Sequence, residues 1–271
     1  MNHSAVTQLS QYYDSVAASY EYVWAPVFTL PACDLVTMLG LPSRGRVLDV
    51  GTGTGVALLA AVQAVGPAGL VLGLDPSAEM LRIARSKGGS PLVVGEVPGV
   101  PFADGTFDAV LANFVVSHFP EYDAALFDMV RVLQPGGQLG VTAWGATRSE
   151  FSRVWQEVAE SFVSKELLLD AGRQGPPWEQ WFSDPVHLRQ ALRDAGLISV
   201  KLRNGKYKTV MSVAAYLVTR EISLQGRFMH QTLSPAGWKR FRASVAEEFR
   251  SRFGGSITYP GEAHLAVGTR P

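Results

Sequence analysis

The residues of this sequence best suited to binding chemistry lie in the run VLDVGTGTG, from Val47 to Gly55. Asp49 supplies a carboxylate, and Gly51, Gly53 and Gly55 follow it at alternate positions. Glycines allow a sharp turn and leave no side chain between the backbone and a ligand. The dinucleotide fingerprint G-x-G-x-x-G is not matched, and a carboxylate beside the turn would repel a pyrophosphate. The pattern therefore predicts a site for a nucleotide-like ligand that carries a cationic group.

Two further polar residues follow expected strands. Asp75 ends the apolar run 70–74, and an acid about 20 residues past such a turn can accept hydrogen bonds from both hydroxyls of a ribose. This feature indicates an adenosine without saying which cofactor carries it. His118 follows the run 107–113, at the sheet edge where ligands bind. Its ordinary pKa of about 6.5 suits a general base, so His118 is the predicted catalytic residue. A role as a wall of the pocket stays open.

The elements that must position these residues alternate between short apolar runs and amphipathic segments. Strands are expected at 46–50, 70–74, 91–95, 107–113, 138–144, 197–210 and 256–268. Helices are expected at 8–20, 34–39, 56–65, 77–85, 122–133, 150–169, 184–195, 212–229 and from Ser234 onward. This alternation predicts an α/β fold with a doubly wound sheet, in which the carboxyl ends of parallel strands share one edge.

Ordered motifs over residues 46–144 resemble those of the class I SAM-dependent methyltransferases. They are Asp49-x-Gly51-x-Gly53-x-Gly55, Asp75, the segment 95–108 and Leu133-x-Pro135-Gly136-Gly137. The chain is most similar to the group that includes ubiquinone and menaquinone C-methyltransferases and many natural-product enzymes. The resemblance implies a Rossmann-like, seven-stranded, mostly parallel sheet with an antiparallel last strand and a helical lid. It also implies S-adenosylmethionine (SAM) as the methyl donor and S-adenosylhomocysteine as the product.

The resemblance further implies where the cofactor lies. The expected cofactor residues are Tyr20, Asp49, Gly51, Thr52, Gly53, Gly55, Asp75, Pro76, Met80, Glu96, Val97, Asn113, Phe114 and His118. In this family an acid after the third strand faces the adenine amino group. Glu96 occupies that place here and is one methylene longer than the usual aspartate.

Segments outside the motifs are expected to close the site. We expect a helical arm at 1–43, a SAM-binding core at 44–147, a lid insertion at 148–182, and the rest of the core at 183–271 with a second lid insertion at about 211–233. The arm pattern Tyr13-Asp14-x-x-Ala17-x-x-Tyr20 is similar to one that folds over the cofactor in small-molecule methyltransferases. The expected substrate-binding residues are Tyr13, Trp144, Trp178, Trp181 and Phe228. Ordinary core packing is the alternative explanation for these aromatic side chains.

The amino-acid composition indicates which kinds of partner the protein is not expected to bind. The chain has 24 Lys plus Arg and 24 Asp plus Glu, so its formal net charge is zero and it shows no electrostatic footprint for nucleic acid. Cys33 is the single cysteine, which excludes an intramolecular disulfide and a multi-cysteine zinc site, and no other metal-ligand pattern is visible. The apolar stretch 56–74 is interrupted by the turn 66–69, so no membrane span is expected. We therefore expect a cytoplasmic protein without a metal, and the oligomeric state is not indicated.

The predicted activity is methyl transfer from SAM to an O, N or C nucleophile of an apolar or aromatic small molecule, natural-product-like or quinone-like. One alternative is a SAM-binding protein of the same fold that uses the cofactor structurally or catalyses a rearrangement, because fold does not fix function. A nicotinamide-dependent oxidoreductase is disfavoured by the glycine spacing and by Asp49.

Overall fold

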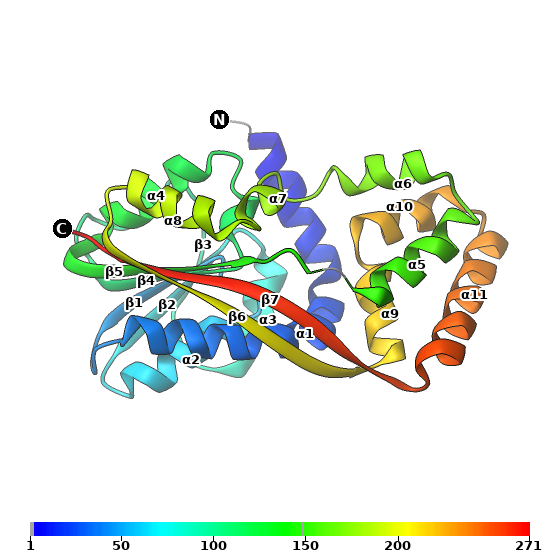
Figure 1. The fold of residues 1–271 in the computed structure, drawn as a ribbon. Coiled ribbons are helices and arrows are strands. Elements are labelled where there is room, and N and C mark those ends of the chain that lie inside the picture. The colour runs from blue at the N-terminus through cyan, green and yellow to red at the C-terminus, as the bar shows by residue number, and fades with distance from the viewer. Residues whose placement is uncertain (1–2, 148) are drawn as a thin grey trace.

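Seven strands form one mixed sheet in the order β3-β2-β1-β4-β5-β7-β6 in the computed structural model (Figure 1), which describes residues 3–147 and 149–271. The strands are β1 (Arg46–Val50), β2 (Leu70–Asp75), β3 (Leu92–Val94), β4 (Phe107–Asn113), β5 (Leu133–Trp144), β6 (Ile198–Ser212) and β7 (Ser256–Thr269). Strands β1 to β5 pair in parallel, and β7 pairs antiparallel with both β5 and β6. The expected doubly wound α/β fold with an antiparallel last strand is confirmed.

Helices cover both faces of the sheet. They are α1 (His3–Leu39), α2 (Val56–Val65) and α3 (Ala78–Lys87), then the 3-10 helix η1 (Val116–His118), α4 (Tyr122–Arg131) and α8 (Pro185–Asp194). Leu35 of α1 and Leu58 of α2 belong to one buried apolar layer. Leu126 of α4 and Leu192 of α8 belong to a second. Because strands β1 and β4 lie between the two layers, the sheet edge where they end is held rigidly.

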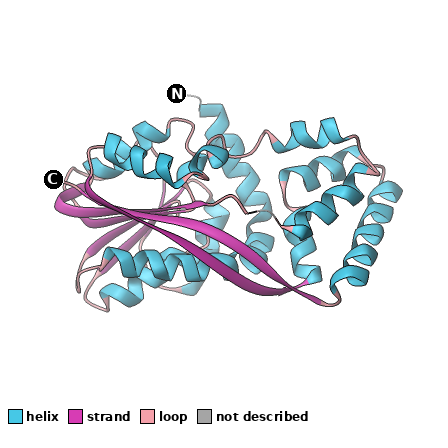
Figure 2. Ribbon diagram, viewed as in Figure 1, coloured by secondary structure: helices cyan, strands magenta, loops and turns pink. Residues whose placement is uncertain are grey.

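A helical subdomain extends beyond the carboxyl ends of β5 and β6 (Figure 2). It consists of α5 (Glu150–Glu160), α6 (Lys165–Gly172), α9 (Val213–Glu221), α10 (Leu224–Thr232) and α11 (Pro235–Phe253). Its own buried core includes Trp155, Tyr216, Phe241 and Phe249. Strands β6 and β7 continue past β5 as a two-stranded ribbon, since residues 256–262 of β7 pair only with β6. The ribbon therefore carries the subdomain to the edge of the sheet where the site is expected.

The N-terminal arm differs from the expected pair of short helices. Residues 3–39 form one helix, α1, which contains Pro26 and Pro31. A proline inside a helix removes a hydrogen bond and costs about 3 kcal/mol or more, so the local sequence favours a break. Burial of Phe28, Ala32 and Leu35, each less than 10% exposed, offsets that cost. One continuous helix thus reaches from the core of the sheet to the site.

The same helix is long and apolar enough to cross a membrane, as judged from its length and composition over Leu9–Leu39. Half of its most apolar window is buried inside the protein. Packing on the sheet accounts for that apolar face, since residues of α1 contact α2, α3 and β5.

Two expected long helices are each broken into two. The segment 150–169 divides into α5 and α6, and the segment 212–229 divides into α9 and α10. Ser164 accepts a hydrogen bond from the Leu167 backbone, and Ser223 accepts one from the Gly226 backbone. Serine in this position caps a new helix, which lets the chain turn and pack around the core of the subdomain. The first two residues of the expected arm and Arg148, where the expected lid insertion begins, lie outside the described residues.

Candidate functional site

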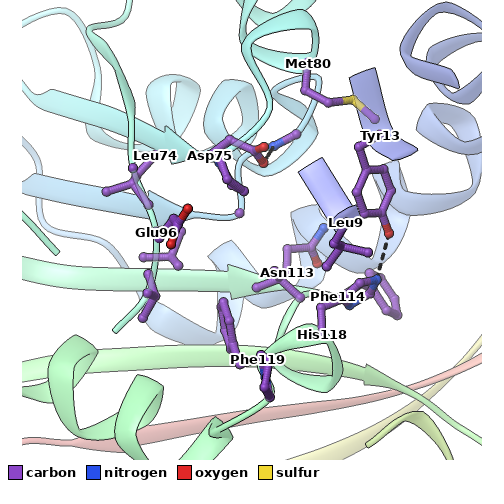
Figure 3. Close-up of a pocket in the computed structure, with 18 of the residues that line it drawn as sticks. Leu9, Tyr13, Leu74, Asp75, Met80, Glu96, Asn113, Phe114, His118 and Phe119 are labelled. Carbon is purple, nitrogen blue, oxygen red and sulfur yellow. Dashed lines mark hydrogen bonds between the residues drawn. The ribbon is translucent and has the colours of Figure 1, made fainter. Parts of the chain in front are cut away.

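A cavity of about 100 Å³ opens where β1, β2 and β4 end (Figure 3). The strand order reverses between β1 and β4, and doubly wound sheets bind their ligands at such a point. Most of the expected cofactor residues line this first cavity. They are Tyr20, Gly51, Gly53, Asp75, Pro76, Met80, Glu96, Val97, Asn113, Phe114 and His118.

Sequence reasoning missed several residues of the first cavity. These are Leu9, Val50, Leu74, Gly95, Val115, Phe119 and Pro120, and Tyr13, expected only at the substrate, lines it as well. Val50, Leu74 and Gly95 adjoin expected site residues, so the strand ends themselves were the signal. Nothing in the sequence indicated Leu9, because its position depends on the unbroken course of α1.

Three expected cofactor residues, Asp49, Thr52 and Gly55, do not line the cavity. The Thr52 hydroxyl donates to Asp49 Oδ2 at 2.7 Å, within the turn. Gly55 has a φ of +88°, and a Cβ there would lie 3.2 Å from the Cβ of Ala84. Such backbone is strained for other residues, and the close approach of α3 leaves little room. These three residues build the glycine turn from behind the cavity, and their contact with a cofactor stays a prediction.

Asp49 is the most deeply buried acid of the site, at 1% exposure. Burial raises its pKa to about 7, Asp75 adds to the rise, and the Thr52 hydrogen bond opposes it. Its Oδ1 atom is buried and has no hydrogen-bond partner among the described residues. A carboxylate in this state gains from a cation placed beside the turn, because an opposite charge favours the ionised form.

Replacing Asp49 with asparagine is expected to stabilise the ligand-free protein by about 1–2 kcal/mol at pH 8. Because the folded-state pKa of Asp49 is raised, its contribution to folding stability is present below the ordinary pKa of the carboxyl and is lost as the pH rises through about 7. Asparagine cannot ionise, so the variant avoids that loss of stability. Its amide NH₂ lacks a hydrogen-bond partner, however, which destabilises the variant by about 1–3 kcal/mol. Urea unfolding of both proteins at pH 5 and pH 8 measures the difference.

The exposed Asp194→Asn is the matched control for this experiment, with an expected change within about 0.5 kcal/mol at both pH values. A variant Asp49→Asn that is less stable than the wild type at pH 8 would contradict the assignment of a buried carboxylate with a raised pKa.

Asp75 lines the cavity and is held in one orientation by the backbone. Its Oδ2 accepts from Gly53 N at 2.8 Å and its Oδ1 accepts from Ser77 N at 2.9 Å. Burial raises its pKa to about 6, although the hydrogen bonds from Ser77 and Gly53 oppose the rise. Each oxygen keeps a free lone pair, so the carboxylate can accept two more hydrogen bonds from a ligand.

Helix α1 is anchored directly to this loop. Asp14 Oδ1 accepts from the Ser77 hydroxyl at 2.6 Å and from Glu79 N at 3.1 Å. These bonds satisfy donors at the start of α3, where a negative charge is favoured by the helix dipole. The anchor places Tyr13, the neighbour of Asp14, over the cavity.

Tyr13 and His118 form a hydrogen-bonded pair across the cavity wall, with 2.7 Å between Tyr13 Oη and His118 Nε2 (Figure 3). Burial lowers the pKa of His118 to about 4, with a small opposing effect of the Val115 backbone. Burial also raises the pKa of Tyr13 well above its ordinary value. The expectation that His118 titrates near neutrality is therefore wrong. Both groups are neutral at physiological pH, and we assign the tautomer in which Nε2 accepts from the Tyr13 hydroxyl.

A second cavity, of about 450 Å³, lies between α1, the end of the sheet and the helical subdomain. It shares Tyr13, Tyr20, Phe114 and His118 with the first cavity. Aromatic rings form much of the remaining wall: Trp24, Phe28, Trp144 and Tyr259. The rings of Phe114 and Trp144 are 4.2 Å apart between centroids. The two cavities are thus adjoining chambers, and Tyr13 and Trp144, two of the expected substrate residues, both line the second.

Three expected substrate residues, Trp178, Trp181 and Phe228, line neither cavity. The indole of Trp178 packs on Tyr122 and donates to the Pro120 carbonyl at 3.1 Å. The indole of Trp181, on α7 (Glu179–Phe182), is 45% exposed and stacks on His187. Phe228 packs against the core of the helical subdomain. Aromatic content alone could not separate these packing roles from a ligand role.

Polar residues of the second cavity were missed by sequence reasoning. Glu179, Arg220 and Gln225 line it, and none of them belongs to a motif. Among the residues that the structure describes, no group of three or more His, Cys, Asp or Glu side chains could hold a metal ion.

Comparison with known proteins identifies the family and the fold. A family model described as a methyltransferase domain matches residues 48–141, and one for protein-L-isoaspartate(D-aspartate) O-methyltransferase matches residues 4–89. The chain is 40% identical over 176 residues to demethylmenaquinone methyltransferase of Staphylococcus aureus. This alignment covers 61% of the chain and 73% of that protein.

Solved structures share the fold at lower identity. Phosphoethanolamine N-methyltransferase 2 of Haemonchus contortus, solved with S-adenosylhomocysteine, has a TM-score of 0.56 at 17% identity, covering 98% of this chain and 59% of its own. The cyclase SpnF has a TM-score of 0.56 at 21% identity, covering 97% of this chain and 95% of its own. Because these two matches cover nearly the whole chain, the similarity of fold includes the helical subdomain.

Proposed function

The chain belongs to the class I SAM-dependent methyltransferases, and from this premise we propose that it transfers a methyl group from SAM to a small aromatic acceptor held in the second cavity. The observation that carries the proposal is the pair of adjoining chambers with a common wall at Tyr13, Tyr20, Phe114 and His118. A cofactor in the first chamber and an acceptor in the second would meet at that wall. A wall of this kind brings reactants together and excludes water.

The residues of the first cavity fit SAM. We assign the ribose hydroxyls to Asp75, whose oxygens keep free lone pairs, and the adenine to the region of Glu96 and Val97. The ammonium group suits the glycine turn, where the unpartnered Oδ1 of Asp49 adds negative potential from behind. Gly53 leaves open space, since a Cβ there would meet only the Gly51 carbonyl, at 4.0 Å.

SAM supplies an electrophilic methyl group, which passes to the acceptor nucleophile while the sulfonium becomes the neutral thioether of S-adenosylhomocysteine. The protein supplies the path for the proton that the acceptor loses. We propose that Tyr13 Oη accepts this proton while its own proton moves to His118 Nε2, 2.7 Å away. No charge is held on the tyrosine, whose raised pKa disfavours a free phenolate.

Binding measurements test the cofactor assignment. The purified protein should bind SAM and S-adenosylhomocysteine with micromolar dissociation constants, or about 7–9 kcal/mol, and should show no heat with NAD or NADP. Isothermal titration calorimetry measures all four ligands. Tight NAD binding without SAM binding would overturn the proposal and favour the oxidoreductase alternative.

A second candidate is a SAM-binding protein of this fold that catalyses another reaction. The likeness to SpnF, which is named a cyclase, supports keeping this candidate. Formation of S-adenosylhomocysteine in step with acceptor consumption separates the two functions, because a rearrangement leaves SAM unchanged.

We propose a cytoplasmic location and no nucleic-acid or membrane partner. The zero formal charge supports the absence of a nucleic-acid partner. The half-buried apolar window of α1 supports a packed helix rather than a membrane span.

A further inference from the structure

Arg220 of α9 is a charged side chain that lines the aromatic second cavity. Its guanidinium lies over the Trp155 ring, 4.3 Å from the centroid, and Nη2 donates to Gln225 Oε1 at 3.0 Å. Gln225 in turn donates to the Leu168 carbonyl. The guanidinium is thus oriented by packing and by a hydrogen bond to a neutral amide.

This cation has no counter-ion in the part of the chain that the structure describes. Among the described residues no carboxylate lies within 4.0 Å of Arg220, and its buried Nε has no hydrogen-bond partner. The next residue, Glu221, instead pairs with Arg242 at 2.7 Å. Burial lowers the pKa of Arg220. Arg220 is half-buried, and its Nε is fully buried. A charge so placed without a counter-ion is costly to a fold, so its position in a ligand cavity points to a ligand that neutralises it.

The other residues of the cavity wall indicate the shape and polarity of the part of the ligand that lies outside the Arg220 contact. Flat aromatic rings of Trp24, Phe114 and Trp144 favour a planar aromatic molecule. A guanidinium suits a planar carboxylate, because its fork of N–H groups matches two carboxylate oxygens. We propose that the acceptor is an aromatic carboxylic acid whose carboxylate binds Arg220, an inference that rests on the proposed methyl transfer.

Glu179 lies on the wall of the same cavity, and its carboxylate would favour a cationic ligand instead. The residue as a whole is exposed, but burial around the carboxyl raises its pKa, which favours the neutral form. The guanidinium of Arg220 stays charged and is covered by Trp155 and Gln225. The half-buried cation therefore has the greater need for a ligand of opposite charge. A matched aromatic amine tests the alternative in which Glu179 selects the acceptor.

The probes are para-hydroxybenzoate and a hydroxynaphthoate, each with its matched carboxamide and aminomethyl analogue. Calorimetry in saturating S-adenosylhomocysteine should show at least one acid binding about tenfold or more tightly than its amide and its amine, as expected for a charge-assisted bond. Arg220→Gln should weaken binding of that acid about 10–100-fold and change amide binding less than about threefold. Glu179→Gln removes a carboxylate from the wall of the same cavity and should strengthen acid binding. The matched control is Arg189→Gln, at an exposed position of α8 outside both cavities, which should leave acid binding unchanged.

Arg220→Lys keeps the charge without the fork and should fall between Arg220→Gln and the wild type. If a variant does not fold, the comparison of acid and amide binding to the wild type still tests the proposal. The proposal is overturned if the amides or amines bind as tightly as the acids, if no acid binds, or if a folded Arg220→Gln binds the acid unchanged. Binding of S-adenosylhomocysteine, measured first on each protein, separates these outcomes from a failure of the proposed function.

Discussion

The His118→Ala enzyme is expected to turn over about 10²–10³-fold more slowly than the wild type, with an affinity for SAM that changes less than about threefold. General base catalysis contributes typically about 10²–10⁴-fold. The lower part of that range applies because burial makes the imidazole a weak base, with a pKa of about 4. Single-turnover rates at saturating SAM isolate the chemical step from product release.

The pH profile of this enzyme follows from the same burial. His118 accepts a proton only when it is neutral, so kcat at saturating SAM should stay level from about pH 8 to pH 6 and fall as the pH drops towards about 4. A rise through about pH 6.5 would mean that the imidazole is more exposed to water than the structure indicates. The profile of His118→Ala should lack the acid limb.

Two matched variants show whether the histidine acts through Tyr13. Tyr13→Phe removes the hydroxyl that lies 2.7 Å from Nε2 and should lower turnover nearly as much as His118→Ala. The double variant should then add little, as expected for two residues that act as a unit. His187→Ala, whose ring stacks on exposed Trp181, is the surface control and should be unchanged. A loss below about threefold in His118→Ala would reduce the histidine to a wall of the cavity.

Replacing Asp75 with alanine should weaken SAM binding by about 2–4 kcal/mol. Two hydrogen bonds from ribose hydroxyls to a carboxylate are each worth about 1.5–3 kcal/mol and do not add fully. The variant also loses the acceptors of Gly53 N and Ser77 N, both within 3 Å of the carboxylate. Calorimetry with SAM and with S-adenosylhomocysteine measures the loss for the charged and the neutral cofactor.

Controls separate the ribose contact from disturbance of the loop. Ser77→Ala removes the cap of α3 and the hydroxyl that Asp14 binds, so it should lower stability by about 0.5–2 kcal/mol but weaken SAM binding less than Asp75→Ala. Asp75→Asn keeps an acceptor oxygen and should lie between the two. Because the pKa of Asp75 is raised to about 6, wild-type affinity should also weaken below that pH as the carboxylate gains a proton. An unchanged dissociation constant in Asp75→Ala would place the ribose elsewhere.

The core of the site could be predicted because it is local in the sequence. A strand, a glycine turn and a helix occupy one short stretch, and Asp75, Glu96 and Asn113 each follow directly from an apolar run. Parallel strands bring their carboxyl ends to one edge, so these residues had to converge once the runs were read as strands. The fold class was predicted from the same pattern, and the antiparallel last strand from the family resemblance; both are confirmed.

The sequence by itself therefore determined the sheet, the glycine turn and the edge at which the first cavity lies. Only the tertiary structure decided that α1 continues through Pro26 and Pro31, since burial against the sheet outweighs the cost of the prolines. The same packing decided which aromatic rings face a cavity and lowered the pKa of His118. It also placed the Arg220 guanidinium beside that cavity, with no carboxylate partner among the described residues. Burial and electrostatic environment depend on contacts between segments far apart in the chain, and no local pattern records them.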